Sequence, residues 1–99
     1  MGAQVFTADA RGRNAREAFN EAVADAVHWY GHDAYNGTIS TCTGSGQDFI
    51  EIALNEGESI EDWQRRMWDD ERVEKWGPCG CVQDRSDPEL WHFSGWAAT

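Results

Sequence analysis

Residues 14–30, with the sequence NAREAFNEAVADAVHWY, carry the strongest pattern in the chain. Their apolar side chains recur at steps of three and four residues, while charged and polar side chains fill the opposite side. This spacing predicts an amphipathic α-helix, and its many alanines predict a flat face suited to packing on a sheet. Asn14 stands where a side chain caps the first free amides, and Glu17 occupies the reciprocal position. Gly31 follows as the residue type that most readily ends a helix.

Short segments on both sides of this helix have the composition of β-strands. Successive side chains of residues 4–8 would point to opposite sides of a first strand. Over 38–42, β-branched residues stand at alternating positions, as in a second strand. Aromatic and β-branched residues dominate 49–54, which is the clearest strand signal in the sequence. Because the connection over 43–48 is rich in glycine, we predict that the second and third strands form a hairpin.

The remaining half of the chain predicts one more helix and two more strands. Ser59, with an acidic residue three positions later, predicts the start of a helix over 60–76, and the Gly-Pro pair at 77–78 predicts its end. Residues 79–83 and 90–96 then indicate two final strands joined by a polar turn.

These elements predict a single α+β domain spanning residues 1–99, because this length suits one domain and leaves no room for two. The predicted order is β-α-β-β-α-β-β. We expect a four- or five-stranded, mainly antiparallel sheet with both helices packed on one of its faces.

Three short stretches rich in glycine and tryptophan resemble a known group of proteins. They are WYGH at 29–32 running into YNGTI at 35–39, KWGPCGC at 75–81 and FSGWA at 93–97. Their order and spacing are similar to those of small uncharacterised proteins encoded by tailed bacteriophages and prophages, notably those of actinobacteria. No activity is established for that group, so no residue role carries over. The resemblance implies a phage accessory protein that acts in the cytoplasm of an infected bacterial host.

The charge of the chain disfavours several classes of partner. It has 8 Lys and Arg against 18 Asp and Glu, for a net charge of -10. Such a surface repels phosphate backbones and anionic membranes, so we expect no direct binding to nucleic acid or to a membrane. The first residues lack the basic and apolar segments of a signal peptide, which favours a cytoplasmic location.

Metal binding is weakly supported by the cysteines and histidines. A zinc site would need Cys79 and Cys81 to converge with His28 and His32. Because Gly31 is expected to end the helix between the two histidines, this geometry is disfavoured. We therefore predict no metal and no cofactor, and interpret the thiols as buried and reduced. A metal held through the two cysteines stays open as an alternative.

Catalysis is also weakly supported. A reactive thiolate needs a positive environment that this acidic chain does not offer, and adjacent carboxylates on a helix point about 100° apart. We therefore predict a protein that is not an enzyme. The alternative is a protein that binds a small ligand or a nucleotide, with its pocket near Tyr35, residues 44–46 and the end of the first helix.

Tryptophan and acidic residues indicate a protein-binding surface. Six tryptophans are more than a small core needs, and residues 51–99 hold 5 basic against 12 acidic residues, a net charge of -7. Trp68 falls at the edge of the predicted inner helix face, so we predict a partner-binding site made of Trp68, Asp69, Asp70 and Glu71. The expected partner is a host or phage protein, such as a basic nucleic-acid-binding protein whose ligand charge is mimicked. A homodimer is a further hypothesis, through the strand at 90–96 if it lies at a sheet edge.

Overall fold

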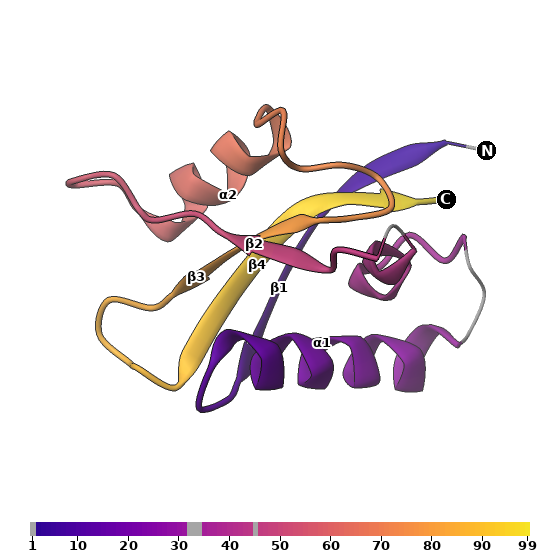
Figure 1. Ribbon diagram of the computed structural model, residues 1–99, viewed down its shortest axis with the longest axis horizontal. Helices are drawn as coiled ribbons and strands as arrows, with labels where there is room; N and C mark the ends of the chain where they lie inside the picture. The colour runs from indigo at the N-terminus through magenta and orange to yellow at the C-terminus, as the bar shows by residue number, and fades with distance from the viewer. Residues whose placement is uncertain (1, 32–34, 45) are drawn as a thin grey trace.

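The computed structural model describes residues 2–31, 35–44 and 46–99, in which a four-stranded sheet separates two α-helices (Figure 1). The fold class is confirmed as α+β. The elements in chain order are β1 (Ala3–Arg11), α1 (Ala15–Tyr30), the 3-10 helix η1 (Ile39–Thr43), β2 (Phe49–Glu51), α2 (Ile60–Trp68), β3 (Cys79–Gln83) and β4 (Leu90–Ala98).

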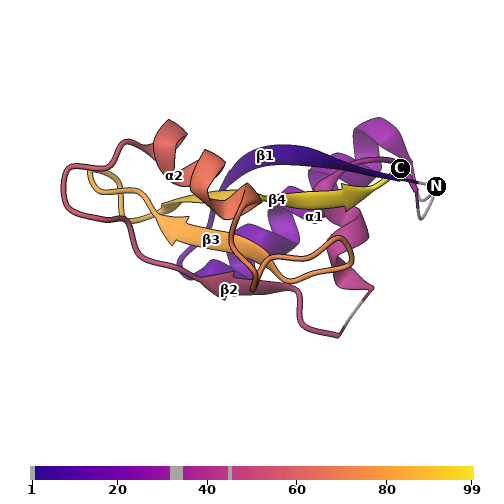
Figure 2. The same ribbon diagram turned by 90° about the horizontal axis from the view of Figure 1, so that it is seen from above.

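The strands lie side by side in the order β1-β4-β3-β2, which Figure 2 shows from above. β1 and β4 pair antiparallel over their whole length, from Ala3 opposite Ala98 to Arg11 opposite Leu90. β3 is also antiparallel to β4, whereas β2 runs parallel to β3. The sheet is therefore mixed rather than mainly antiparallel. β4 is an interior strand, so the prediction that residues 90–96 form an edge is wrong, and the edges are β1 and β2.

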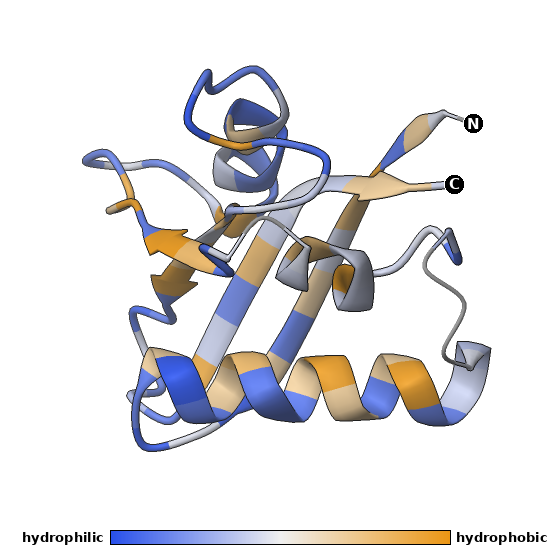
Figure 3. Ribbon diagram, turned by 45° about the vertical axis from the view of Figure 1, so that its right-hand side comes forward, coloured by the Kyte–Doolittle hydropathy of each residue, from blue (hydrophilic) through white to orange (hydrophobic). Residues whose placement is uncertain are grey.

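The first helix matches its prediction closely. Asn14 caps α1, and its side-chain oxygen accepts a hydrogen bond from the backbone N–H of Glu17 at 2.9 Å. The helix ends at Tyr30, and the residue that caps it, Gly31, has a φ of 83°, a positive value that glycine adopts without strain. Polar and apolar bands alternate along α1 (Figure 3), and the side chains that face the sheet are Ala15, Ala18, Phe19, Ala22 and Ala26.

The predicted strand over 38–42 is wrong, because this segment forms the 3-10 helix η1. The Thr38 side chain caps η1 by accepting from the N–H of Ser40, and the Asn36 side-chain oxygen accepts from the N–H of Thr38 at 3.0 Å. Such local side-chain bonds satisfy backbone groups that a strand would leave for a ladder. The hairpin predicted with residues 49–54 is therefore wrong as well, and β2 pairs with β3 instead.

The second helix is much shorter than predicted. Ser59 caps α2 as expected, but the helix ends at Trp68 rather than at residue 76. The next residues are polar and turn back on themselves, since the Asp70 carboxylate accepts the backbone N–H of Arg72 at 2.9 Å. Inside α2, fully buried Trp63 donates its Nε1–H to the carbonyl of Ile52 at 2.9 Å.

The two helices pack on opposite faces of the sheet, so the prediction that they share one face is wrong (Figure 1). On one face, α1 packs on Phe93, Trp91 and the cysteines of β3. On the other, Trp63 and Met67 of α2 belong to a second core with Val82. Consecutive residues of β3 and β4 are buried, as in strands covered on both sides, and each face needs its own helix.

Candidate functional site

The predicted partner site lies where α2 ends, and the structure divides its four residues into two kinds. Trp68 is the last residue of the helix and is half-buried against the sheet. Its indole Nε1–H points to the carbonyl of Phe6 in β1 at 3.4 Å, and its own carbonyl accepts the indole N–H of Trp96 at 2.9 Å. Trp68 therefore fastens α2 to the sheet, and its ring does not stand free on the surface.

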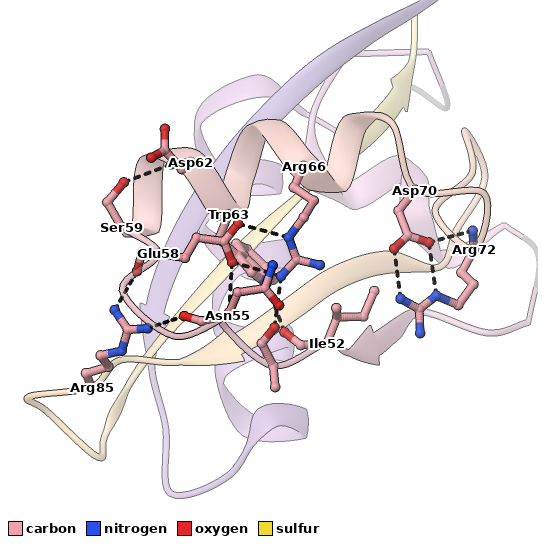
Figure 4. A network of polar contacts seen from close by, with 11 residues as sticks. Ile52, Asn55, Glu58, Ser59, Asp62, Trp63, Arg66, Asp70, Arg72 and Arg85 are labelled. Carbon is pink, nitrogen blue, oxygen red and sulfur yellow. Dashed lines mark hydrogen bonds and ion pairs between the residues drawn. The ribbon is translucent and has the colours of Figure 1, made fainter.

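Asp70 is likewise engaged within the protein. Its carboxylate accepts from the Nε and Nη2 of Arg72 at 3.0 and 2.8 Å as well as from the Arg72 backbone (Figure 4). The hydrogen bonds from Arg72 lower the pKa of Asp70 to about 2. Only 13% of its side chain is exposed, so Asp70 serves mainly to shape the turn.

Asp69 and Glu71 are the members of the predicted site that face solvent. Neither forms an ion pair with any residue in the described part of the chain. They border a hollow of about 580 Å³, whose other lining residues are Arg66, Asp70 and Arg72. Asp69 and Glu71 therefore carry solvent-facing charges on either side of Asp70, whose carboxylate is paired with Arg72.

A polar network that the sequence does not reveal joins α2 to the loop before it and to the turn between β3 and β4 (Figure 4). Arg66 donates to both oxygens of Glu58 at 2.9 Å and to the carbonyl of Ala53 at 3.0 Å. Arg85 donates to the carbonyls of Asn55 and Glu58 from the turn between β3 and β4. The hydrogen bonds from Arg66 lower the pKa of Glu58 to about 2. Three separate segments are joined here, and nothing in their linear spacing indicates the contact.

A second buried polar pair joins β4 to the turn that precedes it. His92 contacts Asp84 through Nε2 and Oδ1 at 2.8 Å, and their side chains are only 10% and 16% exposed. The hydrogen bond with His92 and those from Ser86 hold the pKa of Asp84 well below its usual range. The Ser86 hydroxyl donates to the carboxylate rather than to the imidazole, so the three residues lack the order of a nucleophile, base and orienting acid.

The three cysteines are free and buried, which agrees with their interpretation as core residues. Burial raises the pKa of Cys81 to about 12 and raises that of Cys79 well above its usual range. Protonated thiols are poor nucleophiles and poor metal ligands. Among the described residues, which exclude His32, no group of three or more candidate ligands is placed to hold a metal ion.

The surface near Tyr35 and Gly44, predicted as an alternative ligand site, is an aromatic cluster. The ring of Tyr35 meets the ring of Trp76 edge-on at 5.5 Å. Gly44 lies against the same tryptophan, and Trp76 and Trp96 line a hollow of about 660 Å³ beside them. Residue 45 of the predicted loop lies outside the described residues.

Comparisons of the chain with protein-family models, curated proteins and solved structures return no match. Within the described ranges, neither α-helix has the length and apolar character needed to cross a bilayer.

Proposed function

We propose that the chain is a phage accessory protein that binds another protein in the host cytoplasm and performs no chemistry of its own. The phage context rests on the resemblance of its glycine- and tryptophan-containing stretches. The binding role rests on one observation, which is that the turn after α2 presents Asp69 and Glu71 to solvent beside a hollow. We call this surface, made of Asp69, Asp70 and Glu71, the acidic turn.

The acidic turn is held in place before any partner arrives. Trp68, which precedes the turn, forms hydrogen bonds with β1 and β4. Within the turn, the Arg72 side chain donates to the Asp70 carboxylate. The Arg66–Glu58 pair fixes α2 to the preceding loop. A surface ordered in this way loses little conformational entropy on binding, which favours affinity.

The charge around the acidic turn indicates the chemistry of the partner. The half of the chain that contains it has a net charge of -7 over residues 51–99, from 5 basic and 12 acidic residues. A basic surface complements this field, and such complementarity speeds encounter at low ionic strength. Basic grooves are typical of proteins that hold nucleic acid. The expected partner is therefore a basic host or phage protein whose nucleic-acid site is occupied by acidic side chains.

Charge reversal at the acidic turn tests this proposal. The double variant Asp69→Lys, Glu71→Lys reverses the two solvent-facing charges and leaves Trp68 and Asp70 in place. The matched control is Glu21→Lys, Glu89→Lys, which makes the same change in net charge at exposed positions of α1 and the β3–β4 turn.

The assay is affinity capture from host cells, followed by titration of the identified protein against the wild type and both variants. We expect the turn variant to weaken binding at least tenfold in low salt and the control to weaken it less than threefold. Equal losses in both variants would show that net charge alone drives capture, and no loss in either would place the binding surface elsewhere.

A second candidate function is the binding of a small ligand, and the hollow of about 660 Å³ beside Trp76 favours it. A ligand that binds only the folded state raises the melting temperature according to its occupancy. A thermal-shift screen with nucleotides tests this candidate. A shift that disappears in Trp76→Ala would support it, and the lack of any shift would oppose it.

A further inference from the structure

The outer side of β1 is an open sheet edge. Among the described residues, β1 pairs with β4 alone, and Gly2 exchanges both backbone hydrogen bonds with Thr99 at one end of this pairing. At the other end Gly12 donates to Glu89. Hydrogen-bonded pairs in an antiparallel ladder recur at every second residue, so the even-numbered residues of β1 bond to β4. The N–H and C=O groups of the odd-numbered residues therefore point away from the sheet.

Three of these outward residues, Val5, Thr7 and Asp9, border a groove. Their backbone groups form no hydrogen bond with any turn, loop or cap in the described part of the chain. The strand has no proline and no bulge, so its outward N–H and C=O groups are regularly spaced. Another strand can pair with such an edge.

The groove beside this edge has a volume of about 470 Å³. One wall is residues 4–9 of β1, the other is provided by Asp25 and Tyr30 of α1, and residues 36–39 complete it. Gln4 ties the start of β1 to this segment by donating to the carbonyl of Gly37 at 3.0 Å. The groove is therefore a formed surface between a strand edge and a helix.

Exposed apolar side chains mark the same place. Val5 and Tyr30 line the groove and are 38% and 66% exposed. Trp29, next to Tyr30 at the end of α1, is 71% exposed. A strand that adds to a sheet edge is recognised through main-chain hydrogen bonds and through contacts to its alternate side chains. The unpaired backbone groups of β1 offer the first, and the exposed apolar side chains beside them offer the second.

The charge of the groove selects among possible occupants. Its charged lining residues within the described chain are Asp9 and Asp25, and both are acidic. A second copy of this chain would bring another net charge of -10 to the same edge and is disfavoured. An extended segment that carries lysine or arginine gains from both carboxylates.

We propose that β1 and the adjoining groove bind an extended, basic segment of another protein, which pairs with β1 as a fifth strand. The groove borders residues 4–9 of β1, or about 20 Å of strand, so the segment has about six residues in contact. Lysine or arginine on the side facing α1 meets Asp25, and apolar residues on the opposite side meet Val5, since Phe6 and Ala8 are the β1 residues that pack toward α1. This site lies on the α1 side of the sheet and is separate from the acidic turn of α2.

A proline substitution provides a sharp test, because β1 is an edge strand. Thr7→Pro removes an outward N–H that makes no bond to β4, and proline is tolerated at such edge positions. Thr7→Val is the matched control, since it keeps the N–H and the strand propensity. Asp25→Asn removes one groove carboxylate without touching the strand.

The probes are two capped eight-residue peptides, one alternating lysine and valine and the other alternating glutamate and valine. Each is titrated into the ¹⁵N-labelled full chain while amide shifts and amide hydrogen exchange are followed. With the lysine peptide, we expect the amides of Val5, Thr7 and Asp9 to shift and to exchange more slowly. We expect the glutamate peptide to bind at least tenfold more weakly.

Among the variants, we expect Thr7→Pro to weaken binding of the lysine peptide at least tenfold, Asp25→Asn to weaken it severalfold and Thr7→Val to leave it unchanged. If Thr7→Pro fails to fold, slowed exchange of the Thr7 amide in the wild type decides the question. Equal binding by the proline and valine variants, or shifts confined to another surface, would overturn the proposal. Protection of the β1 amides by self-association alone would overturn it in favour of a second copy.

Discussion

Gly80 offers the most direct test of how α2 sits on the sheet. A Cβ atom added at residue 80 of β3 would lie 2.7 Å from Cγ of Met67 and closer still to its sulfur. Met67 is fully buried in the core beneath α2, so its side chain has little space into which to retreat. Gly80→Ala is therefore expected to push against the helix.

The size of the effect follows from two opposing contributions. Overpacking a filled core costs about 1–3 kcal/mol. Replacing glycine by alanine also restricts the unfolded chain, which offsets about 0.4–1 kcal/mol of that cost. We expect Gly80→Ala to lower the free energy of unfolding by about 1–2 kcal/mol. Met67→Ala alone leaves a cavity and costs about 2–5 kcal/mol.

The double variant makes the test specific. The methyl group that Gly80→Ala adds enters the space left by Met67→Ala. The double variant is therefore expected to lose less free energy of unfolding than the two single variants together, with an interaction energy of about 1–2 kcal/mol. Urea unfolding of the four proteins in the cycle measures this energy. Gly95→Ala is the matched control, since its Cβ meets Cys79 at 3.0 Å and Val73 at 3.1 Å rather than Met67. Strict additivity of Gly80→Ala with Met67→Ala would refute this packing of α2.

Three further predictions concern a buried hydrogen bond, a paired carboxylate and the buried thiols. Trp63→Phe leaves the buried carbonyl of Ile52 without its donor and is expected to cost about 1–3 kcal/mol in urea unfolding, provided that the fold is retained by circular dichroism. The pKa of Glu58 is lowered to about 2 in the folded state from 4.5, so the unfolded chain binds more protons between these values and stability falls as the pH is lowered through this range. Urea midpoints measured from about pH 6 down to about pH 2 check this loss, and Arg66→Gln is expected to flatten the profile. Cys81, whose pKa is raised to about 12, and the other two buried thiols are expected to react with a thiol reagent in mildly alkaline buffer only after unfolding, and rapid labelling of the native protein would contradict their burial.

Local patterns explain what can be predicted about the fold. The spacing of apolar residues over 14–30, with Asn14 before it and Gly31 after it, predicts α1 and both of its ends. These signals act within one or two turns, so they survive in the linear sequence. Alternation marks β1, and the polar turn between β3 and β4 marks those two strands.

Competition between local and distant bonds explains what the patterns miss. Residues 38–42 have strand composition, yet side-chain bonds from Asn36 and Thr38 favour η1. The end of α2 depends on Asp70 accepting from Arg72, a turn that helix periodicity does not encode. The placement of the helices on opposite faces follows from burial of β3 and β4 on both sides, which short apolar runs only suggest.

The candidate site shows the same division. Composition indicates a polar, acidic segment over 69–71, which the helix predicted over 60–76 would include, whereas the structure exposes Asp69 and Glu71 in a turn that follows α2. Helix spacing places Trp68 at the edge of the inner face, but only the structure shows that its indole is tied to Phe6 across the sheet. The open edge of β1 depends on strand order, and no local pattern in residues 3–11 distinguishes an edge from an interior strand.

The proposal that this protein binds a basic partner through the acidic turn is tested most directly by mapping the bound surface. The ¹⁵N-labelled full chain is titrated with the captured partner, and every amide shift is followed. We predict that the amides of Asp69 and Glu71 shift and that the shifts diminish as salt is raised. Shifts confined to Gly44 and Trp76, with the acidic turn unaffected, would contradict it.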